Sequence, residues 1–63
     1  MTSLQQRRKA AGFTQQQLAD MIGVNRTTLT MWETGENMPP SKYLVPLAEA
    51  LGCTVDELLK SAD

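Results

Sequence analysis

The stretch that decides the fold is Gln15 to Thr34, QQQLADMIGVNRTTLTMWET. Apolar residues recur at helical spacing on both sides of Gly23, which predicts two helices joined by a tight turn. Thr14 and Gln17 have the spacing of a capping box just ahead of Leu18, so the first of these helices begins there. Its buried stripe is expected to consist of Leu18, Ala19 and Ile22.

The second helix of this stretch, at about 25–34, has two unlike faces. One side carries Leu29, Trp32 and Glu33. The opposite side carries Thr27, Thr30, Met31 and Thr34, with Arg26 at its flank and Asn25 as the expected N-cap. This outer face has no acidic residue, and its β-branched threonines weaken the helix intrinsically. We infer that a requirement other than helix stability placed them there.

Composition narrows the possible functions. The chain has 63 residues, 41% hydrophobic and 21% charged, which predicts one small globular domain over 1–63. It has no apolar run long enough to cross a bilayer and no signal segment, so we expect a soluble cytoplasmic protein without a membrane partner. Cys53 is the only cysteine and histidine is absent, so we expect no metal, no cofactor, no small-molecule ligand site and no enzymatic activity.

The net charge of −1 hides a polar distribution. Residues 1–32 hold four cations against one acid, which is 4 − 1 = +3, and residues 33–63 hold two cations against six acids, which is 2 − 6 = −4. A basic front half permits contact with nucleic acid, although a charge run is more often a solvated surface. The acidic back half is expected to face away from DNA and to offer a dimer surface.

A helix is expected to precede the central stretch, over Met1 to Ala11. Helical spacing places Leu4, Arg8 and Ala11 on its inner side. Arg7 and Lys9 flank Arg8 and are expected in solvent. Gly12 then ends the helix, because glycine reaches positive φ at little steric cost.

Two more helices are expected after Gly35 and the loop from Glu36 to Pro40. Ser41 is the predicted N-cap of the fourth, and Pro46 predicts a kinked or 3₁₀-like start. The inner face of that helix is predicted to hold Leu44, Leu47, Ala48 and Leu51, ahead of a stop at Gly52. Thr54 and Glu57 form a second capping box, and the fifth helix is predicted to bury Val55, Leu58 and Leu59. Cys53 is expected to be a small apolar filler.

From Leu4 to Leu59 the sequence resembles the Cro/C1-type helix-turn-helix domains of phage repressors and of the xenobiotic-response-element group of bacterial regulators. The residues that carry the resemblance are Gln15, Leu18-Ala19, Ile22-Gly23-Val24, Leu29, Trp32-Glu33, Gly35, Pro40-Ser41 and the run from Ala48 to Leu59. The resemblance implies an all-α, compact five-helix lambda-repressor-like domain whose third helix enters the DNA major groove. It also implies a double-stranded DNA operator as partner, bound by a homodimer.

The resemblance further implies site residues. Arg26 is expected at a guanine edge or a phosphate, and Gln15 at a phosphate, where free backbone N–H groups also favour an anion. The remaining DNA-binding candidates are Asn25, Thr27, Thr30, Met31, Thr34, Asn37 and Lys42. Glu36 departs from the positive character of this loop in the family. Arg8 and Glu33 match a family ion pair, so we expect a structural salt bridge there and Trp32 in the core.

The sequence therefore predicts a small transcriptional regulator, a repressor that acts by occupying its operator. An alternative keeps the fold and changes the class, to a protein-interaction module or an antitoxin-type partner. The chain has no long acidic, toxin-wrapping tail, which counts against the antitoxin. An assay of binding to random duplexes at two salt concentrations separates these readings.

Overall fold

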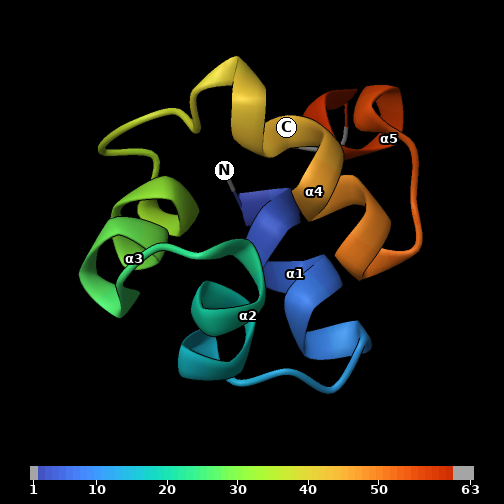
Figure 1. The fold of residues 1–63 in the computed structure, drawn as a ribbon. Helices are drawn as coiled ribbons and strands as arrows, with labels where there is room; N and C mark the ends of the chain where they lie inside the picture. The colour runs from blue at the N-terminus through green and yellow to red at the C-terminus, as the bar shows by residue number, and fades with distance from the viewer. Residues whose placement is uncertain (1, 61–63) are drawn as a thin grey trace.

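The computed structural model describes residues 2–60, which form five α-helices and no strand (Figure 1). The helices are α1 (Thr2–Ala10), α2 (Gln15–Ile22), α3 (Arg26–Thr34), α4 (Ser41–Leu51) and α5 (Val55–Lys60). Helix α1 packs against α3 and α5, α2 packs against α3 and α4, and α4 packs against α5. The predicted all-α fold with five helices is confirmed.

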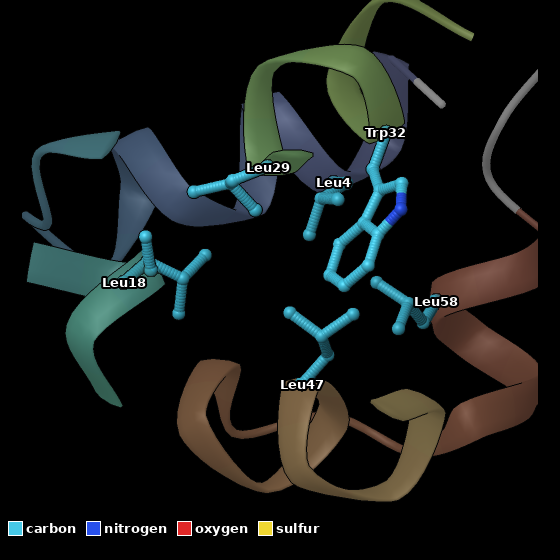
Figure 2. Packing of buried hydrophobic residues seen from close by; sticks show 7 residues of the cluster. Leu4, Leu18, Leu29, Trp32, Leu47 and Leu58 are labelled. Atoms are coloured by element: carbon cyan, nitrogen blue, oxygen red, sulfur yellow. The ribbon is translucent and has the colours of Figure 1, made fainter. Parts of the chain in front are cut away.

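One hydrophobic core joins all five helices. In Figure 2 the side chains of six residues converge on the same space, and each is at most 2% exposed. They are Leu4, Leu18, Leu29, Trp32, Leu47 and Leu58. The ring of Trp32 also lies against Tyr43, with centroids 5.3 Å apart and planes at 43°. Because full burial of one such side chain contributes roughly 1.5–3 kcal/mol, this core is the main attractive term in a small domain.

Two capping boxes start α2 and α5. At α2, Thr14 Oγ1 accepts from the Gln17 N–H at 3.0 Å, and the Thr14 N–H donates to Gln17 Oε1 at 2.8 Å. Thr54 and Glu57 repeat the arrangement at α5, at 3.0 and 2.9 Å. Each box gives partners to backbone N–H groups that the first turn of a helix leaves free. Both predicted boxes are confirmed.

The turn between α2 and α3 is closed by the backbone and by one side chain. Gly23 has φ of 87°, in the left-handed region, and its N–H donates to the Ala19 carbonyl at 2.8 Å. Asn25, two residues after the glycine, is the N-cap of α3. Its Oδ1 accepts from the Thr28 N–H at 2.7 Å. The turn at Gly23 and the cap at Asn25 were both predicted.

Two predicted helix ends are wrong. Ala11 is exposed rather than inward, because α1 ends at Ala10 and the Gly12 N–H bonds to Lys9 O at 3.1 Å in a tightened last turn. Ser41 is not the N-cap of α4. Pro40 occupies that position with ψ of 153° and no side-chain bond, and its carbonyl accepts from the Tyr43 N–H at 2.9 Å.

Two side-chain expectations also need correction. Leu59 is 41% exposed, since Leu58 takes the inward position of the short α5. Arg7 is only half-exposed, and its Nε is buried without a hydrogen bond. Helix α4 contains Pro46 and is α-helical from Ser41 onward, and the three-residue bond from the Tyr43 N–H to the Pro40 carbonyl gives its start the predicted 3₁₀ character. Met1, Asp63 and the side chain of Lys60, which entered the predicted first helix and the charge count, lie outside the described residues.

Candidate nucleic-acid interface

The outer face of α3 keeps the composition that the sequence indicated. Arg26, Thr27 and Thr34 are exposed, whereas Thr30 and Met31 are half-buried. The opposite face is buried and consists of Leu29, Trp32 and Glu33. The core therefore holds α3 by one side and presents the other, which carries one cation and no acid.

Two threonine hydroxyls of α3 are engaged in hydrogen bonds within the helix. Thr30 Oγ1 donates to the Arg26 carbonyl at 2.9 Å, and Thr34 Oγ1 donates to the Met31 carbonyl at 3.2 Å. Because both hydroxyls donate to carbonyls of their own helix, neither proton is free for an acceptor outside the protein. Among the described residues the Thr27 hydroxyl has no hydrogen-bond partner. Thr27 can therefore offer a hydroxyl to a base edge, whereas Thr30 and Thr34 offer apolar surface.

The N-terminus of α2 contacts α3 through a bond from Gln15 to Glu33, on the buried face of α3, that no sequence pattern predicted. Gln15 is half-buried, and its Nε2 donates to Glu33 Oε1 at 2.9 Å. The two residues are 18 positions apart on different helices, so no spacing rule within one helix could reveal the bond. The contact brings the half-buried Gln15 next to α3.

Glu33 is also held by Arg8, from α1. Arg8 Nε donates to Glu33 Oε2 at 2.6 Å and Nη2 donates to Oε1 at 3.4 Å, while Nη1 donates to the Phe13 carbonyl at 2.8 Å. The two side chains are 9% and 2% exposed. The ion pair that was expected between these residues is thus present, and it joins α1, the α1–α2 loop and α3.

The outlying candidates are placed unequally. Asn37 follows α3 closely, because its N–H donates to the Met31 carbonyl at 3.2 Å and its Nδ2 lies 3.6 Å from Met31 Sδ. Asn25 is exposed and uses Oδ1 for the α3 cap. Lys42 is exposed near the start of α4, with Nζ 5.1 Å from the centroid of the Tyr43 ring. Asn25 and Asn37 therefore flank the two ends of α3, and Lys42 belongs to α4.

An open groove of about 570 Å³ lies beside α3. Its walls come from the turn after α2, the inner side of α3, the loop before α4 and α4 itself. They include Val24, Thr28, Trp32, Met38 and Tyr43. No sequence pattern predicted this groove, because its walls come from segments that only the folded structure brings together.

The basic front half is less basic at its surface than the charge count indicates. Arg8 is buried in its ion pair, and Arg7 is close enough to Glu57 to lower the pKa of that carboxyl. The larger causes of the lowered pKa of Glu57 are its hydrogen bonds with the Thr54 backbone and side chain. Lys9 and Arg26 are the exposed cations of residues 3–32.

Two kinds of feature are absent from the described residues, a metal-binding cluster and a membrane-spanning helix. No group of three or more histidine, cysteine, aspartate or glutamate side chains is placed to hold a metal ion. No helix between residues 2 and 60 is both long and apolar enough to span a membrane.

The sequence is similar to those of several transcriptional regulators. The chain is 44% identical over 55 residues to the cryptic phage CTXphi transcriptional repressor RstR of Vibrio cholerae, across 87% of this chain and 49% of that protein. It is 37% identical over 60 residues to the HTH-type transcriptional activator BcrR of Enterococcus faecalis, across 95% and 29%. It is 39% identical over 54 residues to repressor protein C2 of Salmonella phage P22, across 86% and 25%. The chain thus spans about half or less of the length of these relatives.

Solved structures share the fold. The crystal structure of the P22 c2 repressor protein in complex with a synthetic operator matches with a TM-score of 0.88 and 36% identity, covering 94% of this chain and 89% of that chain. The solution structure of the DNA-binding domain of the same repressor matches with a TM-score of 0.87. A family model described as helix-turn-helix matches residues 4–58. The chain therefore belongs to the Cro/C1-type helix-turn-helix family, with α2, the turn at Gly23 and α3 as its helix-turn-helix unit.

Proposed function

We propose that this chain binds double-stranded DNA sequence-specifically and regulates transcription by occupying an operator, as a repressor. Helix α3 enters the major groove in this proposal, and the N-terminus of α2 lies on the phosphate backbone. The direct contacts are made by Gln15, Asn25, Arg26, Thr27, Thr30, Met31, Thr34, Asn37 and Lys42. Residues 1–63 act as one DNA-binding domain.

The outer face of α3 is the observation that carries this proposal. It presents Arg26, threonine and methionine side chains on a helix whose other face is fixed in the core. An acid on such a face would meet phosphates or the acceptor-rich edge of guanine, and this face has none. The similarity to a repressor solved with its operator supports the same docking for this chain.

A homodimer completes the proposal. Exposed apolar side chains on α4 and α5 provide a surface for a second copy, since Val45 is 54% exposed and Leu59 is 41% exposed. Two copies would read half-sites about 34 Å apart, one turn of the double helix. The regulator acts in the cytoplasm by binding rather than by catalysis, in keeping with a family of transcriptional regulators.

Selection from a random duplex library at two salt concentrations tests the function. We expect one enriched sequence with two related half-sites, and an affinity that falls with salt because phosphate contacts release counterions. The alternative of a protein-interaction module predicts no enrichment at either salt concentration, and that result would reject the proposal.

A reporter gene placed behind the enriched sequence then tests the direction of regulation. Repression by the chain is the expected outcome, although BcrR, one of the relatives, is named an activator. Increased transcription from the reporter would overturn the repressor assignment and leave DNA binding in place.

A further inference from the structure

We propose that Glu33 is a positioning residue for DNA binding, because it orients the Gln15 amide toward a backbone phosphate. This inference rests on the proposed function. It assigns the pair of Arg8 and Glu33 a role beyond holding the fold together. The ion pair is buried. Gln15, which bonds its carboxylate, is half-buried and so reaches the surface.

The orientation of the amide follows from the charge of its partner. Glu33 Oε1 accepts from Gln15 Nε2 at 2.9 Å, and Glu33 Oε2 accepts from Arg8 Nε at 2.6 Å. A carboxylate accepts hydrogen bonds and cannot donate them, so the amide must turn its nitrogen toward Glu33. An amide nitrogen carries two protons, and the second remains available to an acceptor outside the protein.

The position of Gln15 makes a phosphate the fitting acceptor. Gln15 is the first residue of α2, where backbone N–H groups without helical partners favour an anion. An unpaired carboxylate behind it would repel the same anion. Arg8 removes that repulsion by neutralising Glu33, so the three residues together present a donor with no net charge behind it.

Gln16 provides an internal control. It is the next residue on α2 and also donates to a carboxylate, with Nε2 2.9 Å from Asp20 Oδ1. That bond joins two exposed residues of α2 and does not involve α3. The two glutamines therefore share residue type and bond type, and they differ in whether the partner is fixed in the interior.

The test compares DNA affinities in two backgrounds. The first is the wild-type chain, and the second is Arg8→Met with Glu33→Met, since apolar replacement of a whole buried ion pair often leaves the fold stable. Gln15→Met and Gln16→Met are made in each, and thermal melting confirms that all variants are folded at the assay temperature. The probe is the duplex enriched from the random library.

We expect Gln15→Met and the paired Met variant each to weaken binding by roughly 10–150-fold, as the loss of one hydrogen bond to a charged group implies. Combining them should weaken it by less than about a further 2-fold, because both remove the same contact. Gln16→Met should have no effect in either background. If Gln15→Met weakens binding equally in both backgrounds, or if the paired Met variant binds as wild type, the positioning role is refuted.

A measurement on the unaltered chain separates this inference from the function itself. In the free protein, side-chain amide relaxation should give Gln15 an order parameter near the rigid value of about 0.85 and Gln16 one below about 0.6. Equal mobility of the two amides would overturn the inference even if the chain binds DNA. Failure to enrich any duplex would reject the proposed function and leave this measurement interpretable.

Discussion

The guanidinium of Arg8 and the carboxylate of Glu33 meet inside the protein, with Nε 2.6 Å from Oε2, and tie α1 to α3. Glu33 belongs to the buried face of α3 together with Leu29 and Trp32, and the next residue, Thr34, is exposed. Helix α3 is therefore held by an ion pair as well as by apolar packing.

Arg8→Ala should destabilise the domain strongly, because it leaves the Glu33 carboxylate buried without its cation. Breaking one partner of a buried pair costs about 3–5 kcal/mol. At about 4–8 °C per kcal/mol for a domain of this size, the Tm should fall by at least roughly 12 °C. Lys9→Ala on the same helix is the control and should change stability by less than about 0.5 kcal/mol, since Lys9 is exposed. An Arg8→Ala domain that melts at the wild-type temperature would rule this out.

Arg26→Ala should relax sequence preference without unfolding the chain. Arg26 is exposed at the first position of α3, and a bidentate contact with guanine discriminates between bases by about 1–3 kcal/mol. We expect the selected half-site to lose its preference at one position, while the melting temperature stays the same. Selection with the variant measures this directly, and an unchanged preference at every position would show that Arg26 reads no base.

Thr27 and Thr30 should respond differently to the same isosteric change. The Thr30 hydroxyl donates to the Arg26 carbonyl at 2.9 Å, so Thr30→Val removes no hydroxyl proton that is free to bond DNA. Thr27→Val removes a hydroxyl that is exposed. We expect Thr27→Val to lower affinity for the selected duplex by about 3–10-fold, the equivalent of one hydrogen bond, and Thr30→Val to lower it by less than about 2-fold. The opposite ranking in a fluorescence titration would contradict the orientation described for these side chains.

The capping box of α5 should make stability depend on pH. Glu57 has its pKa lowered below its usual 4.5, first by its hydrogen bonds with Thr54 and then by Arg7. Since the folded pKa is below the unfolded one, the stabilisation is complete above the unfolded pKa and is lost as pH falls through the folded pKa. The Tm difference between wild type and Glu57→Ala should therefore be larger near pH 7 and shrink toward pH 3.

Gln17→Ala is the matched control for that titration, because Gln17 fills the same place in the neutral capping box of α2. Its Tm difference from wild type should stay constant over the same range of pH. A Glu57→Ala difference that is equally constant would show that the charge of Glu57 contributes nothing through the cap.

Local signals in the sequence predicted the helices well, and the reasons are physical. The residue pairs Thr14 with Gln17 and Thr54 with Glu57 specify helix starts by hydrogen bonds within four residues, and the structure contains both. Leu29 and Trp32 specify the buried side of α3 by spacing alone. Predictions that depend on one element and its own turn geometry succeeded for this reason.

The errors arose where a neighbouring element decides. Ser41 is a good cap by type, but the extended backbone of Pro40 shifts the start of α4. The position of Arg7 on α1 predicts an exposed side chain. Arg7 is instead half-buried where α1 packs against α5, close enough to Glu57 to lower the pKa of that carboxyl. The contact of Gln15 with Glu33 joins residues 18 positions apart, so it becomes visible only when α2 and α3 are packed.

The central claim is that the outer face of α3 meets DNA, and an NMR titration of the isotope-labelled chain with the enriched duplex tests it most directly. We predict that changes in backbone amide chemical shift concentrate at the start of α2 and along α3, from Gln15 to Thr34. The amides of Glu49 on α4 and Asp56 on α5 should stay unchanged. Shifts concentrated on α4 and α5 with α3 unperturbed would contradict the claim.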